Sequence, residues 1–409
     1  MSVIELKYSG RIIQSEATLP GSKSMSNRLL ILEALSGGKV KGINHSEADD
    51  TKNLIHILKH LPEYADAGAG GTTFRFLLAY LASMEGYEGV LTGSERLQER
   101  PVRQLVEALN KLGADIKYAV KQGFAPLIIK GTRLIGGRVS IDGSISSQFL
   151  SALLLVAPSM QKGLELIPQG KIVSMPYLKM TIEIMKNCGL DVSAEKSGIS
   201  VKSSAFKNIE IPVEKDWSAA AFWYNFVALS APGAEIKMPG LSSKTVQGDG
   251  LTAALYSFFG VTTRETASGI VIKKESEPVR YFAYNFSDQP DLAQAMAVSV
   301  AGNEISATFS GLTSLRNKET DRIEAIRREL KKFDVETTEP ANGILKIDAP
   351  QAELYRSPNI KTYEDHRMAM AFAGLVVKSG TLKITDPEVV AKSYPGFWDD
   401  VLKAGVSIK

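Results

Sequence analysis

The 409-residue sequence is poor in several features that would point to particular classes of protein. It contains one cysteine, Cys188, which rules out an internal disulfide and is typical of a reducing compartment. The apolar neighbours of Cys188 predict a buried structural thiol. No apolar run approaches the roughly 18 residues needed to span a bilayer, and the first residues lack the apolar region of a signal peptide. We therefore expect a cytoplasmic protein that does not contact membranes.

Histidine is scarce and the charges are nearly balanced. Four histidines, without an HExxH motif or cysteine pairs, give no expectation of a metal site. His56 and His60 are one helical turn apart but have no third ligand beside them, so we expect them on the surface. The glycine pattern of dinucleotide-binding folds is also missing. A formal net charge of +3 gives no support for nucleic-acid binding.

The pattern of apolar residues indicates an α/β chain. Short strand-like segments alternate with helical segments rich in alanine and leucine. The expected helices place Leu54, Ile55, Leu58 and Leu61 on one face, Phe74, Leu77, Leu78 and Leu81 on another, and Phe149, Ala152, Leu153 and Val156 on a third. The expected strands cover residues 138–143, 234–240, 305–311 and 344–350.

The length allows two or three domains. Turn-forming residues predict domain boundaries near Pro20 and near residues 212–216. This division gives one domain at 20–214 and a discontinuous second domain made of 1–19 and 215–409.

One local pattern occurs twice. LPGSKSMSNRLLILEAL and IDGSISSQFLSALLLVA each read as a strand, then Gly-Ser-x-Ser, then an apolar helix. A glycine turn followed by a serine cap explains this pattern structurally. The free N–H groups at such a helix start can also bind an anion. The repetition suggests a fold built from several similar α/β pieces.

Basic side chains gather where helices are expected to begin. Lys23 and Arg28 follow one glycine turn, Arg75 follows the turn AGAGG, and Arg100 lies in the arginine-rich segment SERLQERPVR. A cation beside the positive end of a helix is unfavourable unless an anion offsets it. Arginine also suits bidentate recognition of phosphate and carboxylate. Solvated basic faces remain the alternative for each segment taken alone.

The segment SLRNKETDRIEAI is the sharpest of these cases. Asn317 is the expected N-cap, and Ile323, Ile326 and Leu330 form the expected buried face. Lys318 and Arg322 would then lie one turn apart in the first turn of the helix, where two cations repel each other. Such a local conflict is expected where a charged ligand supplies the missing partner.

Further polar residues stand at other expected helix starts. In TYEDHRMAM, Asp365 is the expected N-cap, with His366 and Arg367 just inside the helix. Asp288 and Asp291 open another helix and can act as bases, as ligands for hydroxyl groups or as plain caps. The remaining candidates are Ser146, Ser147, Gln148, Ser174, Tyr177 and Lys392.

These motifs, in this order, resemble the 5-enolpyruvylshikimate-3-phosphate synthase family of enolpyruvyl transferases. The resemblance runs from LPGSKSMSNR through GTTFRF, ERP, DGSISSQF, SMPY, QGD, PDLAQAM, NKETDR and DHRMAM to AKSYP, and so covers nearly the whole chain. It implies two similar domains of repeated βαβαββ units, an inverse α/β-barrel-like fold, with helix N-termini aimed into an interdomain cleft.

The resemblance also implies substrates and site residues. Shikimate 3-phosphate would contact Lys23, Ser24, Arg28, Ser146, Ser147, Ser174, Tyr177, Asp291 and Lys318. Phosphoenolpyruvate would contact Lys23, Gly71, Arg100, Gln148, Arg322, Arg367 and Lys392. Lys318 and Glu319 would transfer protons, with Asp291 near the 5-hydroxyl, and Lys23 would join them as a catalytic residue. The family needs no metal and no organic cofactor, and a monomer that closes its domains on small-molecule substrates is expected.

The sequence departs from the family pattern at a few positions. Ala69 replaces a usual Asn, Phe76 replaces a frequent Pro, and Ser314 replaces an Asn that commonly helps to bind shikimate 3-phosphate. Only residues 62–67 separate the helix at 50–61 from the glycine turn, so strands that normally complete one unit are expected to be missing.

Two other functions remain open from the sequence. The sister family acts on UDP-N-acetylglucosamine and usually carries a reactive cysteine before its Arg-Pro pair, but GSERLQERP contains none. A non-catalytic anion-binding relative is the other alternative. The retained Lys23, Arg100, Lys318, Glu319 and Lys392 argue against it.

Overall fold

The protein folds into two compact units. The structure, a computed structural model, describes residues 2–10, 12–350 and 357–409. Unit 1 comprises Met1–Pro20 together with Glu214–Lys409, and unit 2 comprises Gly21–Val213. None of the helices in the described ranges combines the length and apolar character needed to cross a membrane.

Two stretches of unit 2 follow the same order of elements, strand–helix–strand–helix–strand–strand. One contains β4 (Tyr64–Asp66), α3 (Gly71–Ser83), β5 (Glu88–Thr92), the short α4 (Glu95–Gln98), α5 (Arg103–Lys111), β6 (Asp115–Tyr118) and β7 (Leu127–Lys130). The other contains β8 (Gly137–Asp142), α6 (Ser147–Val156), β9 (Leu164–Gln169), α7 (Met175–Asn187), β10 (Val192–Glu195) and β11 (Gly198–Val201). In each, the first two strands are parallel and the following hairpin is antiparallel.

The third sheet of unit 2 is shorter than the other two. It pairs β3 (Val40–Ile43) in parallel with β12 (Ile209–Pro212), and α1 (Lys23–Leu35) and α2 (Asp49–His60) flank β3 along the chain. Within the described residues no hairpin follows α2, because β4 of the next repeat already occupies Tyr64–Asp66. The predicted loss of strands beside residues 62–67 is therefore confirmed.

Unit 1 contains the same repeat three times in its described residues. The contiguous copy contains β16 (Tyr281–Asn285), α10 (Ala293–Gly302), β17 (Ser306–Ser310), α11 (Arg322–Lys331), β18 (Thr337–Ala341) and β19 (Ile344–Ile347). A second contains β20 (Asn359–Ile360), α12 (His366–Ala373), β21 (Thr381–Thr385), α14 (Phe397–Lys403) and β22 (Val406–Ile408), and β1 (Val3–Tyr8) completes its sheet. The third contains β2 (Gln14–Glu16), α8 (Trp217–Leu229), β13 (Glu235–Pro239), α9 (Thr252–Ser257), β14 (Val261–Thr266) and β15 (Gly269–Lys274), and all of unit 2 is inserted between β2 and α8.

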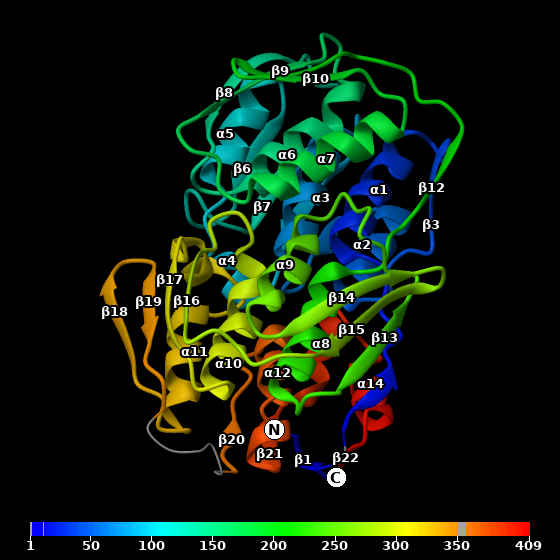
Figure 1. Cartoon of the computed structure of the whole chain (residues 1–409). Helices are drawn as coiled ribbons and strands as arrows, with labels where there is room; N and C mark the ends of the chain where they lie inside the picture. The colour runs from blue at the N-terminus through cyan, green and yellow to red at the C-terminus, as the bar shows by residue number, and fades with distance from the viewer. Residues whose placement is uncertain (1, 11, 351–356) are drawn as a thin grey trace. The chain divides into compact units, whose positions relative to one another are not determined.

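Helices form the interior of each unit. In unit 2, α3 packs against α1 and α6, and α7 packs against α1 and α6; in unit 1, α10 packs against α8 and α12 (Figure 1). Every residue of α10 and of α12 is buried. A helix that is buried on all sides must be mostly apolar or small-sided, as AQAMAVSVAG is. The α/β class with repeated βαβαββ units is thus confirmed.

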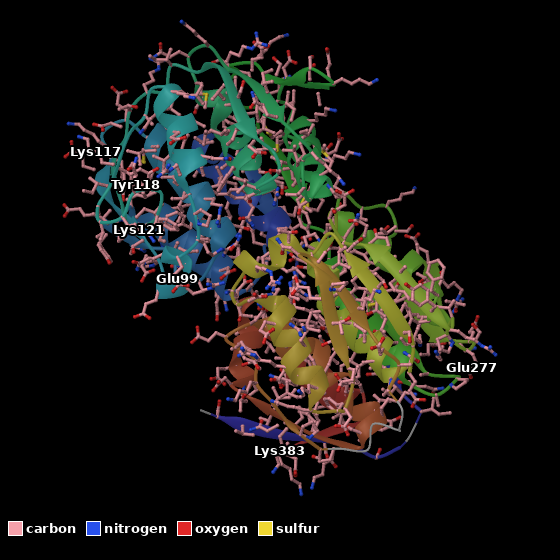
Figure 2. The ribbon with its side chains drawn as sticks, turned by 90° about the vertical axis from the view of Figure 1, so that its left-hand side faces the viewer. Glu99, Lys117, Tyr118, Lys121, Glu277 and Lys383 are labelled. Atoms are coloured by element: carbon pink, nitrogen blue, oxygen red, sulfur yellow. The ribbon has the colours of Figure 1, made fainter. Side chains whose placement is uncertain are left out.

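The sheets present one apolar and one polar face. Lys383 of β21 lies between the buried Leu382 and Ile384, and Lys117 of β6 follows the buried Ile116. Figure 2 shows the side chains of Lys117 and Lys383 pointing away from their units. This alternation is what a sheet with one solvated face requires.

The predicted face of the helix at 50–61 is wrong. The buried residues of α2 are Thr51, Leu54 and Ile57, whereas Ile55 is 38% exposed. Apolar residues lie on two overlapping faces of this helix, so either face could be the buried one. A hydrogen bond of 3.0 Å from Thr51 Oγ1 to Asn27 Oδ1 in α1 selects the observed one.

Other local predictions are confirmed. The predicted faces of α3 and α6 are fully buried, and the four predicted strands are β8, β13, β17 and β19. Cys188 is buried, and burial raises the pKa of its thiol to about 11. His56 and His60 are exposed on α2.

Candidate active site

The loop that carries Lys318 and Glu319 precedes a helix rather than belonging to it. A 3-10 helix at Thr313–Asn317 comes first, and α11 begins at Arg322 with Asp321 as its N-cap. The Asp321 carboxylate accepts a hydrogen bond from the backbone N of Glu324 at 3.2 Å. The prediction that Asn317 is the cap is therefore wrong, and so is the placement of Lys318 in the first turn. The D-x-x-E spacing of Asp321 and Glu324 is itself a capping pattern.

Three cations converge on the carboxylate of Asp291, in a 3-10 helix (Pro290–Leu292) before α10. Lys318 Nζ lies 3.3 Å and Arg322 Nη1 2.9 Å from Asp291 Oδ1. Arg367 Nη2 lies 3.1 Å from Asp291 Oδ2. Burial alone would raise the pKa of Asp291, but the charges of Arg367, Lys318 and Arg322 hold it well below its usual value. Asp291 is therefore ionised here, and it is not a helix cap.

Arg322 is the centre of this arrangement. Its Nε donates to Asp365 Oδ2 at 2.6 Å, and its Nη2 donates to Glu319 Oε2 at 2.8 Å. Burial disfavours its charge, but the carboxylates of Asp365, Glu319 and Asp291 raise its pKa above the ordinary value. The side chain is only 2% exposed. Arg322 thus holds three carboxylates in fixed positions.

The unit 1 cluster carries one more cation than carboxylate. Lys392 Nζ lies 3.6 Å from Glu319 Oε1, which adds a fourth cation. We use "the unit 1 cluster" for Asp291, Lys318, Glu319, Arg322, Asp365, Arg367 and Lys392. All of these except Asp365 were predicted as site residues. An excess of positive charge favours an anionic ligand.

Arg316 closes the loop of Lys318 and Glu319 from the other side. Its Nη1 lies 2.6 Å from Asp321 Oδ2, and its Nη2 lies 2.5 Å from both carboxylate oxygens of Glu339 in β18. The ends of the loop are thereby tied together and to the sheet. Ser314, one of the departures from the family pattern, lies in the 3-10 helix that carries Arg316.

In unit 2, the start of α3 joins several predicted residues. Lys23, the first residue of α1, places Nζ 2.9 Å from Asp50 Oδ2. Thr73 Oγ1 donates to the backbone oxygen of Asp50 at 3.2 Å. Gln148 Nε2 donates to Thr72 Oγ1 at 2.9 Å. The N-terminus of α3, with its unsatisfied N–H groups, therefore lies among these side chains and suits an anion.

Gly71 lies directly against two guanidinium groups. A Cβ atom at this position would meet the Nη atoms of Arg100 and, at 2.8 Å, Nη1 of Arg75. Arg75 Nη1 also donates to the backbone oxygen of Gly71 at 2.8 Å. The absence of a side chain at Gly71 is thus what allows the two arginines to lie beside the start of α3. Ala69 is exposed in the turn before it.

Arg28 is a buried cation that donates its hydrogen bonds to neutral groups. Its Nε donates to Thr181 Oγ1 at 2.7 Å, and its two Nη atoms donate to the backbone oxygens of Ser24 and Tyr177. Its guanidinium lies over the ring of Phe76, 5.3 Å from the centroid. Burial lowers the pKa of Arg28 to about 10, and no carboxylate of the described residues is paired with it. An anionic ligand would supply the missing charge.

The predicted serines lie at two further helix starts. Ser146 caps α6, and its Oγ accepts from the backbone N of Gln148 at 3.2 Å. Ser147 is the buried first residue of α6. Ser174 precedes α7 with a left-handed backbone, φ 54°, and its carbonyl accepts from the backbone N of Tyr177 at 3.1 Å.

Sequence reasoning missed several partners that hold these residues. Asp50 follows Asp49 at the start of α2, where acidic residues are common because they interact favourably with the helix dipole. Its sequence position therefore gives no sign of a role as the partner of Lys23. Asp365 was predicted only as a cap, which it is, since it accepts from the backbone N of Arg367 at 2.9 Å. Its pairing with Arg322 joins segments 43 residues apart. In the described part of the chain no group of three or more His, Cys, Asp or Glu is arranged to hold a metal ion.

Solved structures support the fold. An EPSP synthase from Acinetobacter baumannii has a TM-score of 0.80 at 21% identity, covering 100% of this chain and 99% of that one. The enolpyruvyl transferase NikO from Streptomyces tendae has a TM-score of 0.76 at 14% identity, covering 100% and 98%. At these identities the likeness shows the architecture alone.

Sequence relatives are more similar. A 3-phosphoshikimate 1-carboxyvinyltransferase from Bacteroides fragilis is 44% identical over 398 residues, which cover 97% of each chain. One from Mannheimia succiniciproducens is 33% identical over 422 residues, covering 95% of this chain and 96% of its own. The model of the EPSP synthase (3-phosphoshikimate 1-carboxyvinyltransferase) family matches residues 8–65 and 62–401, with its two segments meeting at the shortened repeat. The chain therefore belongs to the EPSP synthase family.

Proposed function

We propose that this chain transfers the enolpyruvyl group of phosphoenolpyruvate to the 5-hydroxyl of shikimate 3-phosphate and releases phosphate. The observation that carries the proposal is the convergence of Lys318, Arg322 and Arg367 on the ionised Asp291. One carboxylate among several cations can orient a hydroxyl group while the cations bind an anionic partner. Membership of the EPSP synthase family supports the same reaction.

Phosphoenolpyruvate is proposed to bind mainly through basic side chains. Arg322 and Arg367 take its carboxylate. Its phosphate is bound by Lys23, Arg100, Gln148, Lys392 and the backbone near Gly71. Arginine forks suit the planar carboxylate, and the start of α3 suits the phosphate.

Shikimate 3-phosphate is proposed to bind through neutral donors and a few charges. Ser146, Ser147, Ser174 and Lys318 hold its phosphate. Ser24, Arg28, Tyr177 and Asp291 contact its carboxylate and ring hydroxyls, and Lys23 contacts both substrates. The buried Arg28, which otherwise donates to neutral oxygens, thereby gains an anionic partner.

We propose that the reaction proceeds in two steps. The 5-hydroxyl transfers its proton to Asp291 and its oxygen adds to C2 of phosphoenolpyruvate while C3 gains a proton, which gives a tetrahedral intermediate. Loss of a proton from C3 and departure of phosphate from C2 then restore the enol double bond. Lys318 and Glu319 transfer these protons, and Asp291 accepts the hydrogen bond of the 5-hydroxyl. Prearranged cations reduce the repulsion between two anionic reactants.

Substrate binding changes the basicity of Asp291 in this proposal. Its low pKa depends on Arg367, Lys318 and Arg322. When the phosphoenolpyruvate carboxylate draws Arg322 and Arg367 toward itself, Asp291 loses part of that stabilisation and its pKa rises. Asp291 then becomes a better acceptor for the proton of the 5-hydroxyl.

The decisive experiment measures phosphate release. Phosphoenolpyruvate is supplied with shikimate 3-phosphate and, in parallel, with UDP-N-acetylglucosamine. Phosphate release is expected with shikimate 3-phosphate as the acceptor and not with UDP-N-acetylglucosamine. Turnover with the sugar nucleotide alone would overturn the assignment, and binding of both shikimate-reaction substrates without turnover would favour a non-catalytic relative.

Two variants test the proton-transfer roles. Lys318→Ala and Glu319→Ala are expected to abolish turnover while circular dichroism and the melting transition stay close to wild type. Lys331→Ala in α11 and Glu277→Ala, both at exposed positions, are the matched controls and should retain full activity. Near-normal rates in the two site variants would show that the chemistry lies elsewhere.

A further inference from the structure

The turn that leads into α12 has an unfavourable backbone. Tyr363 and Glu364 have φ angles of 54° and 56°. The backbone N of Asp365 donates to the oxygen of Thr362 at 2.9 Å, which closes a four-residue turn. Positive φ at both central positions is readily adopted by glycine and asparagine, whereas larger side chains disfavour it. Contacts from outside the turn must therefore hold it in this form.

A buried carboxylate on α11 supplies one such contact. Tyr363 Oη donates to Glu329 Oε1 at 2.6 Å, and the Glu329 side chain is fully buried. Glu329 Oε2 also accepts from the backbone N of Lys361 and from Lys332 Nζ. Burial and the adjacent Glu329 carboxylate both raise the pKa of Tyr363, so the hydroxyl retains the proton that it donates.

The same face of α11 supplies a second contact. Arg322 and Glu329 are seven residues apart, two helical turns along one face. Arg322 binds the carboxylate of Asp365, and Glu329 binds the hydroxyl of Tyr363. α11 thus holds the residues on either side of Glu364.

We propose that the Tyr363–Glu329 hydrogen bond is a latch that keeps this turn left-handed and thereby positions Asp365 and Arg367 for phosphoenolpyruvate. Asp365 Oδ1 accepts from the backbone N of Arg367, and Asp365 Oδ2 accepts from Arg322 Nε. A shift of the turn therefore moves two arginines together. Tyr363 and Glu329 are positioning residues, since they act through Asp365. The identity of the ligand rests on the proposed function.

The first test removes only the hydroxyl group. Tyr363→Phe keeps the ring but breaks the latch. The KM for phosphoenolpyruvate is expected to rise about tenfold, as for loss of a hydrogen bond to a charged group. The KM for shikimate 3-phosphate should stay within about twofold of wild type, because that substrate is assigned to other residues. A general loss of folded protein would lower the apparent kcat and leave both KM values unchanged.

The second test restores the turn without the latch. Glycine adopts a positive φ readily, so adding Glu364→Gly to Tyr363→Phe is expected to return the KM for phosphoenolpyruvate to near the wild-type value. Glu304→Gly is the matched control. Glu304 is also exposed and left-handed, with φ 58°, but it follows α10 outside this turn. It should give no rescue.

Hydrogen exchange tests the latch independently of turnover. Amides of residues 362–368 are expected to exchange faster in Tyr363→Phe and to recover with Glu364→Gly. If wild type fails to turn over, the proposed function fails and this exchange experiment still decides the latch. Unchanged exchange together with an unchanged KM would overturn the latch. Equal rescue by both glycine variants, or rescue by neither, would also overturn it.

Discussion

Arg322 and Asp365 form an almost completely buried ion pair. Arg322 Nε lies 2.6 Å from Asp365 Oδ2, and the two side chains are 2% and 0% exposed. The pair connects the first residue of α11 to the N-cap of α12. Because Arg322 also binds Asp291 and Glu319, this single contact fixes most of the unit 1 cluster.

Removing one member of the pair should strongly destabilise the fold. Asp365→Ala leaves the Arg322 charge buried without its partner and removes the cap of α12. Such losses lower the free energy of unfolding by about 3–5 kcal/mol. Urea titration measures the change, with Glu324→Ala, which removes the exposed partner of Arg328, as the control. A loss no larger than that of the control would contradict the prediction.

Asp291 should make the protein sensitive to acid. Its pKa in the folded state lies well below the usual value, so its ionised form stabilises the fold. This contribution is complete above the unfolded-state pKa of about 4 and is lost as the pH falls through the folded-state pKa. Wild type should therefore lose more stability than Asp291→Asn between neutral and strongly acidic pH. Urea titrations across this range test it, and parallel pH dependences of the two proteins would refute it.

Phe76 should determine how tightly Arg28 can bind an anion. Phe76 is fully buried, and its ring supports the Arg28 guanidinium. Phe76→Leu removes this surface, whose cation–π contribution at a desolvated site is about 2 kcal/mol. The KM for shikimate 3-phosphate should rise more than that for phosphoenolpyruvate. Phe259→Leu, in the core of unit 1, controls for lost packing and should leave the ratio of the two KM values unchanged.

Arg316 should act on turnover through the loop that it closes. Arg316→Ala releases Asp321 and Glu339, so Lys318 and Glu319 lose their fixed position and kcat should fall with little change in the melting temperature. Arg316→Lys should not restore the rate, because lysine cannot replace the fork of an arginine. Steady-state kinetics of both variants measure this. Full activity of Arg316→Lys would contradict the prediction, because it would mean that a positive charge at this position is enough to hold the loop.

The fold and most members of the unit 1 cluster could be predicted because both leave local patterns. Helical periodicity marks α3 and α6, and motifs at helix starts mark Lys23 and Arg322. The phase of α2 could not be predicted, since it depends on a hydrogen bond between Thr51 and Asn27 in another helix.

The partners of the site residues depend on tertiary contacts. Thr181 binds Arg28 from 153 residues away, and Glu329 binds Tyr363 from 34 residues away. Both residues are ordinary ones for the helices in which they lie, so neither stands out in the sequence as a partner of a distant residue. The N-cap of α11 is different, because the spacing of Asp321 and Glu324 is a local signal in the sequence that favours Asp321 over Asn317.

The insertion of unit 2 between β2 and α8 determines the order in which the chain can fold during synthesis. All strands of unit 2 are available once residue 213 has left the ribosome. Unit 1 must wait, because Leu6 in β1 pairs with Ile408 in β22. β2 can pair with β13 soon after unit 2 is complete, but β1 remains without its partners β21 and β22 while almost the whole polypeptide is made. Protection of β1 by chaperones therefore has its greatest effect in this interval.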